Sequence, residues 1–210
     1  MDLYRMSFWQ VFLSGGPVMW PILLCSIFAL TIIMEKFWYL HKISIDAQEF
    51  LSKILEKMKH HQVKEAIEIC DSTKSPVASI LKAGILKYDR PKQQIKEAIE
   101  DSSLHEIPRL EKNLSALATI AHVSPLLGLL GTVTGMVRCF QTIQAKATSF
   151  HPVSPGDLAG GIWEALLTTV AGLIVAIPAF VAYNYLVSRV NYFILEMEKA
   201  ATELINFLTE

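Results

Sequence analysis

The sequence predicts an all-α membrane protein with three transmembrane helices, long cytoplasmic extensions of those helices and a helical cytoplasmic segment. First, 52% of the 210 residues are hydrophobic, 19% are charged and the net charge is −1. Second, residues 6–34 and 113–137 contain no Asp, Glu, Lys or Arg, and Glu164 is the only one in 158–188. Each run exceeds the roughly 20 residues that cross about 30 Å of hydrocarbon as a helix. Third, the remaining segments have helical periodicity.

Several classes of protein are excluded by composition and motif. A nucleic-acid-binding protein needs a surplus of basic residues, which a net charge of −1 does not supply. The three cysteines are scattered and predict buried apolar residues rather than disulfides, and no Cys or His spacing predicts a metal site. There is no P-loop and no GxSxG motif. The sequence therefore predicts no cofactor, no metal and no enzyme.

The first apolar run predicts a transmembrane helix over residues 17–39. Trp20 and Trp38 are spaced as two interfacial anchors, and the run is too long for the apolar core of a signal peptide, the alternative interpretation. Residues 1–16 contain Trp9 and Phe12 and predict an amphipathic segment that lies along the membrane interface.

The positions of Lys and Arg predict the orientation of the chain. Most of those near the ends of the spans fall in residues 40–112 or after 188, so both segments are expected in the cytoplasm. The second and third spans are expected at 113–143 and 160–188. The outer loop is then 144–159, the N-terminus is outside, and residues 189–210 form a cytoplasmic C-terminal helix.

The cytoplasmic segment predicts several short amphipathic helices. Apolar stripes recur over residues 45–61, 63–70, 77–88 and 92–105, and they need burial against the extensions of the second and third spans. Pro108 is expected to kink or restart the helix, after which the periodicity runs unbroken from Leu110 into the second span.

Polar groups inside the spans are the candidate functional residues. Glu164 is costly in a membrane and marks a functional site, unless it only reaches the outer interface or caps a helix. Thr168 follows it by one turn, whereas Thr169 is offset from it by about 140°. These hydroxyls, with Thr132, predict either a polar stripe beside a pore or ordinary hydrogen bonds to backbone carbonyls.

Small residues in the second and third spans predict close helix packing. Gly131 and Gly135 have GxxxG spacing, and Gly128 and Gly172 belong to the same small-residue faces. The three glycines of the second span could also be mistaken for a phosphate-binding loop, but they lie inside an apolar span.

Two long motifs resemble the MotA/TolQ/ExbB proton-channel family. Residues 124–136, SPLLGLLGTVTGM, resemble the second-span signature of that family, and residues 162–173, IWEALLTTVAGL, resemble its third-span signature. Residues 15–21 with Glu35 resemble its first span, and Ser75-Pro76-Val77 resembles a break in its cytoplasmic segment. The similarity extends over nearly the whole chain, and three spans favour the TolQ/ExbB branch.

The resemblance implies an energy-transducing subunit of the bacterial inner membrane. Members of that branch form a homopentamer around the membrane helices of two ExbD- or TolR-like chains, and proton flow drives work on a TonB- or TolA-like partner. Matching by motif assigns Thr132, Glu164 and Thr169 to the pore and proton pathway. Thr132 and Thr169 are expected at similar depth, with Glu164 partly hydrated about one turn nearer the outer mouth.

Three residues depart from the family pattern or leave alternatives open. Trp163 stands where a small residue is common. Arg138 either reaches the outer interface or pairs with Glu164 or a partner, and His122 is either a helix-contact residue or a proton relay. The alternative functions are a non-conducting membrane scaffold, a flagellar-stator-like motor subunit and an intramembrane enzyme.

Overall fold

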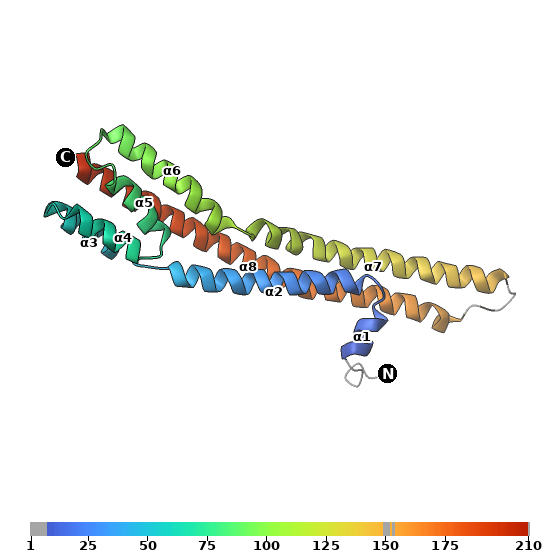
Figure 1. Ribbon diagram of the computed structural model, residues 1–210. Helices are drawn as coiled ribbons and strands as arrows, with labels where there is room; N and C mark the ends of the chain where they lie inside the picture. The colour runs from blue at the N-terminus through green and yellow to red at the C-terminus, as the bar shows by residue number, and fades with distance from the viewer. Residues whose placement is uncertain (1–7, 149–151, 153, 210) are drawn as a thin grey trace. The chain divides into compact units, whose positions relative to one another are not determined.

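The computed structural model describes residues 8–148, 152 and 154–209, and every regular element among them is an α-helix (Figure 1). The chain divides into two compact units. The apolar unit comprises residues 1–34 and 113–184, and the amphipathic unit comprises 35–112 and 185–210. The helices are α1 (Phe8–Ser14), α2 (Met19–Ile43), α3 (Ala47–Lys59), α4 (Val63–Ser72), α5 (Pro76–Ile85), α6 (Lys92–Glu111), α7 (Leu114–Thr148) and α8 (Pro155–Thr209).

Three helices are long and apolar enough to cross a membrane, which confirms the predicted fold class. α2 has 25 residues, α7 has 35 and α8 has 55, so each is longer than the span predicted for it. α8 alone is about 80 Å long at 1.5 Å per residue. Pro125 in α7 and Pro178 in α8 lie inside their helices without ending them. The predicted interfacial segment at residues 1–16 contains α1, and residues 1–7 lie outside the described residues.

The apolar unit is organised by close packing of α7 against α8. A Cβ atom added to Gly131 would lie 2.0 Å from Oγ1 of Thr168, and one added to Gly172 would lie 2.6 Å from the carbonyl oxygen of Ser124. A Cβ atom added to Gly135 would lie 2.5 Å from the carbonyl oxygen of Gly161. Contact positions rise along α7 as they fall along α8, so the two helices are antiparallel.

The amphipathic unit buries one face of each short helix. α3 begins at the cap residue Asp46, whose carboxylate accepts hydrogen bonds from the Gln48 and Glu49 amides. Pro76 occupies the first turn of α5. Gly84 of α5 lies between Ile99 of α6 and Leu204 of α8, so α5 and α6 pack against the C-terminal part of α8. This agrees with the predicted packing of the cytoplasmic helices against the extension of the third span. Their predicted packing against the extension of the second span stays a prediction.

Of the two outcomes predicted for Pro108, a restart of the helix is wrong, and a kink stays a prediction. α6 continues through Pro108 to Glu111, and the chain breaks at Lys112 and Asn113 before α7 begins. Asn113 has a φ of 65°, a left-handed conformation that asparagine tolerates better than most residues. The periodicity from Leu110 is therefore interrupted. Two helix ends also differ: α5 stops at Ile85 rather than Tyr88, and α6 extends beyond His105.

A buried lysine satisfies the end of α6 at this break. Lys36 of α2 is 1% exposed, and its Nζ donates hydrogen bonds to the carbonyl oxygens of Arg109 at 3.2 Å and Leu110 at 3.0 Å. The last carbonyls of a helix have no intrahelical partner and carry partial negative charge, so a cation stabilises them. The sequence alone assigned Lys36 only to the orientation of the first span.

The thiol of Cys70 gives the stability of the amphipathic unit a dependence on pH. Burial raises the pKa of Cys70 from its ordinary value of 9.0 to about 11. The unfolded chain therefore loses this proton first as pH rises, so about 2–3 kcal/mol of stability is expected to be lost between pH 9 and 11. Thermal unfolding of the purified protein at pH 8 and 11 measures it. The midpoint of thermal unfolding should differ less between the two pH values for Cys70→Ala than for the wild-type protein. The same difference in both proteins would contradict the prediction.

Candidate functional site

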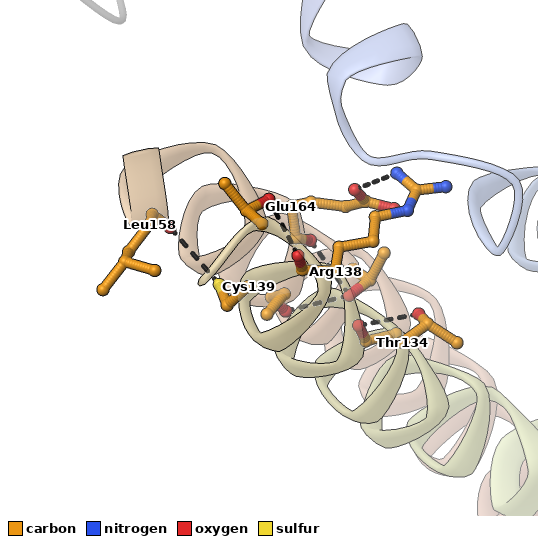
Figure 2. Close-up of polar contacts among 9 residues, drawn as sticks. Thr134, Arg138, Cys139, Leu158 and Glu164 are labelled. Carbon is orange, nitrogen blue, oxygen red and sulfur yellow. Dashed lines mark hydrogen bonds and ion pairs between the residues drawn. The ribbon is translucent and has the colours of Figure 1, made fainter. Parts of the chain in front are cut away.

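An ion pair joins the two main membrane helices near the outer-loop end. Nη1 of Arg138 on α7 donates to Oε2 of Glu164 on α8 (Figure 2). The Glu164 side chain is 7% exposed and that of Arg138 is 50% exposed. Of the two alternatives for Arg138, the structure has the one in which it pairs with Glu164. The carboxylate is buried in the chain, contrary to the partial hydration expected from the sequence.

Gly16 closes the other side of this carboxylate. Gly16 lies in the turn between α1 and α2 and has a φ of 70°, which favours glycine. A Cβ atom there would lie 1.9 Å from Oε1 and 2.7 Å from Cδ of Glu164. Oε1 is buried and accepts no hydrogen bond among the described residues. Sequence analysis missed this role of Gly16, although Gly15-Gly16 before Pro17 is a signal for a turn.

The neighbouring threonines of α8 have different surroundings. Thr168 is fully buried against Gly131, and its hydroxyl donates to the carbonyl oxygen of Ala165 at 2.8 Å. Thr169 is half-buried, with its hydroxyl 3.1 Å from the Ala165 carbonyl oxygen and 3.4 Å from that of Gly128 on α7. Thr168 is therefore a packing residue of the helix pair, and Thr169 lies at its edge.

The helix pair has two flanks with different polar groups. At 100° per residue, Arg138 and Thr132 lie about 120° apart on either side of the glycine stripe of α7. Glu164 and Thr169 lie about 140° apart on either side of the contact face of α8. Because Arg138 meets Glu164, these two define the ion-pair flank, and Thr132 and Thr169 share the opposite one, the threonine flank.

The structure thus divides the three predicted pathway residues between two places. Thr132 and Thr169 share a flank, and Glu164 belongs to the other flank beneath the Gly16 turn. The expectation of similar depth is also wrong. Thr169 lies beside Gly128, which precedes Thr132 by one helical turn, so Thr132 is about one turn nearer the outer loop.

Thr132 resembles Thr169 in its local hydrogen bonding. Its hydroxyl donates to the carbonyl oxygen of Leu129 at 2.6 Å, and its side chain is half-buried. A threonine that donates to its own helix keeps its oxygen lone pairs available to accept a hydrogen bond. Both half-buried threonines can therefore present an acceptor to water or to another helix.

One further hydrogen bond joins α7 to α8 near the outer loop: Sγ of Cys139 on α7 donates to the carbonyl oxygen of Leu158 on α8 at 3.4 Å (Figure 2). The hydroxyl of Thr134 donates within α7, to the carbonyl oxygen of Gly131 at 3.0 Å (Figure 2). Lower down, Nδ1 of His122 is 2.7 Å from the carbonyl oxygen of Ala118, and its ring lies edge-on to Phe180. His122 therefore contacts a residue of the neighbouring helix, which favours the first of its two interpretations, that of a helix-contact residue.

A metal centre is not formed by the part of the chain that the structure describes. Among those residues, no group of three or more His, Cys, Asp or Glu side chains is placed to hold an ion. Within the helix pair, the Arg138–Glu164 ion pair lies on one flank and the hydroxyls of Thr132 and Thr169 lie on the other, while a second ion pair, Lys146 with Asp157, joins the ends of α7 and α8 beside the outer loop.

Comparison with known proteins matches this architecture to a family. The model of the MotA/TolQ/ExbB proton channel family matches residues 72–199. An ExbB-like biopolymer transport protein of Synechocystis sp. is 35% identical over 187 residues, which cover 87% of this chain and 73% of the relative. An ExbB homologue of Methanothermobacter thermautotrophicus is 30% identical over 87% of this chain and 63% of its own length. The TolQ protein of Haemophilus influenzae is 43% identical over 49% of this chain and 45% of its own.

The chain belongs to the MotA/TolQ/ExbB proton channel family. Its named relatives are ExbB and TolQ proteins, which supports the TolQ/ExbB branch predicted from the two span motifs. Members of this family are membrane channel and transport subunits.

We predict that Gly16→Ala damages the ion-pair flank. The added methyl group would overlap the Glu164 carboxylate and strain a left-handed backbone, at a cost of about 2–4 kcal/mol. The midpoint of thermal unfolding in detergent should fall. Gly160→Ala is the matched control, because no described atom beyond its own turns of helix lies within 4 Å of an added Cβ. Equal midpoints for the two variants would refute the role of Gly16.

We also predict that Arg138 matters most as the counter-charge of Glu164. Arg138→Gln leaves a buried carboxylate without its cation and should cost about 2 kcal/mol, discounted for the half-exposed guanidinium. The double variant Arg138→Gln/Glu164→Gln should be more stable than Arg138→Gln alone, because no charge is left buried. Additive losses in a double-mutant cycle of thermal stability would show that the contact contributes nothing.

Proposed function

We propose that this chain is the ring-forming, proton-conducting subunit of an energy-transducing complex of the bacterial inner membrane. Five copies surround the membrane helices of ExbD- or TolR-like chains, two copies in each complex. Proton flow through the assembly drives work on a TonB- or TolA-like effector. The N-terminus is periplasmic, and residues 40–112 and 189–210 are cytoplasmic. The family match over 72–199 supports this proposal.

The observation that carries the proposal is the arrangement of polar groups on the helix pair. Thr132 and Thr169 are the half-buried hydroxyls of the threonine flank, while the Gly16 turn lies on the other flank. In a ring built from this helix pair, the threonine flank faces the central pore. Its hydroxyls then provide hydrogen-bond acceptors to water or to the partner helices in an otherwise apolar wall.

In this proposal Glu164 acts at the outer end of the pathway rather than beside the threonines. Its contacts with Arg138 and the Gly16 turn hold the helix pair and the first span together at that end. Each charge that crosses the membrane releases about 2.3 kcal/mol per 100 mV. In this proposal, the contacts at the outer end keep the helices in place while the assembly converts that energy into work.

We predict that Thr169→Val and Thr132→Val reduce proton flux without preventing assembly. Valine keeps the shape but removes one hydrogen-bonding group, so flux should fall at least about tenfold if the hydroxyls lie on the pathway. The measurement uses proteoliposomes that contain this chain and its ExbD- or TolR-like partner, with a pH-sensitive dye inside. Native mass spectrometry of the same preparations reports the number of subunits.

The matched control is Thr134→Val. Thr134 also donates to a carbonyl of its own helix, but its position on α7 is on the side of Arg138. Thr168→Val is unsuitable, because Thr168 is fully buried against Gly131 and a change there alters packing. Wild-type flux in both flank variants, with intact rings, would remove the threonine flank from the pathway. A stable monomer or dimer in lipid would contradict the ring.

A further inference from the structure

The amphipathic unit contains a polar cavity at the start of α5. The cavity has a volume of about 450 Å³ and is lined by the end of α2, the turn between α4 and α5, and the later part of α6. Its lining includes Tyr39, Lys74, Ser75, Lys82, Glu106 and Arg109. None of these residues belongs to either flank of the membrane helices, so the proposed function leaves the cavity without a role.

Ser75 is the feature that points to a ligand. It is 5% exposed, it lines the cavity, and its Oγ has no hydrogen-bond partner among the described residues. It stands at the N-cap of α5, yet its side chain makes no capping hydrogen bond. Burying a hydroxyl without a partner costs free energy, so a group that bonds this hydroxyl would stabilise the site.

The start of α5 adds electrostatic attraction for an anion. α5 has ten residues, and its first-turn amides lack a side-chain cap. Such amides carry partial positive charge and bind phosphate and carboxylate oxygens in many proteins. Pro76 has no amide hydrogen, and Val77 and Ala78 are not part of the cavity lining, so the start of α5 contributes partial positive charge rather than direct donors. The Ser75 hydroxyl and this positive helix end together favour an anion as the ligand.

The charges that line the cavity leave a positive excess. Lys82 pairs with Asp71, and Arg109 pairs with Glu106 at 3.2 Å. Lys74 is exposed and makes no ion pair within the part of the chain described. Three basic and two acidic side chains therefore line the cavity, and Lys74, the basic residue without an ion pair among the described residues, directly precedes Ser75 in the chain.

We propose that this cavity binds a phosphate group. Lys74 supplies the charge, the Ser75 hydroxyl donates a hydrogen bond to a phosphate oxygen, and the positive end of α5 adds electrostatic attraction. Two sources share this chemistry: the headgroup of an anionic phospholipid and a soluble phosphate compound. Tyr39 and Ile43, at the end of α2, also line the cavity, so a headgroup can reach it if α2 spans the membrane as proposed.

Two measurements on the full-length protein distinguish the sources. Native mass spectrometry after purification from vesicles of phosphatidylcholine with or without phosphatidylglycerol counts retained anionic lipid. Calorimetry with inorganic phosphate in detergent measures binding of the soluble ion. Retained phosphatidylglycerol without phosphate binding assigns the site to the headgroup, and phosphate binding assigns it to soluble compounds. The absence of both overturns the proposal, whatever the proton flux of the same protein.

Variants locate the binding. Lys74→Gln removes the unpaired ammonium from an exposed position and should lower affinity at least about tenfold, because charge-assisted hydrogen bonds are the strong ones. Ser75→Ala should lower it by a smaller factor. Lys87→Gln is the matched control, since it removes the same charge from an exposed residue outside the cavity lining. Equal affinity of the Lys74→Gln and Lys87→Gln variants would place the ligand elsewhere and overturn the assignment.

Discussion

The close approach of α7 to α8 is the constraint on which the membrane part of this protein depends. In a membrane the hydrophobic effect does not drive helices together, so their association relies on packing and on interhelical polar contacts. The glycines of both helices remove the side chains that would hold the backbones apart. Once Gly131 lies on Thr168, the rotation of each helix is fixed. The flank on which every other polar group lies is then fixed as well.

That rotation brings Arg138 and Glu164 together and leaves little freedom around the carboxylate. Burying a charge is costly unless it is paired and hydrogen-bonded. Here one carboxylate oxygen meets the guanidinium, while the other lies against a glycine turn and accepts no hydrogen bond among the described residues. The arrangement depends on Arg138, which lies two residues after the second-span motif and supplies the counter-charge of this carboxylate.

The sequence predicted the helices well because hydropathy and periodicity are local properties. The three spans and the helix predicted within residues 45–61 follow directly from runs of residues. The break at Asn113 was not predicted, because proline is the stronger signal in a sequence. The contact at this break, in which Lys36 bonds the last carbonyls of α6, joins residues more than 70 positions apart and leaves no local pattern.

The errors at the site have a different cause. Glu164 was grouped with the threonines by a family motif, and a motif lists residues without giving their directions around the helix. The register of α7 on α8, the contact of Gly16 with Glu164 and the unbonded hydroxyl of Ser75 are tertiary features. Periodicity showed that Thr169 and Glu164 point apart, but only the packed pair decides what each side faces.

The two interior prolines give the helix pair a difference in stiffness along its length. Pro125 and Pro178 cannot donate to the carbonyls four residues earlier, those of Ala121 and Ile174. Ser124 meets Gly172, so these two carbonyls lie at nearly the same level of the antiparallel pair. The free energy needed to bend each helix is therefore lowest at this shared level. The end held by the ion pair is clamped, and any bending of the pair has its pivot away from that end.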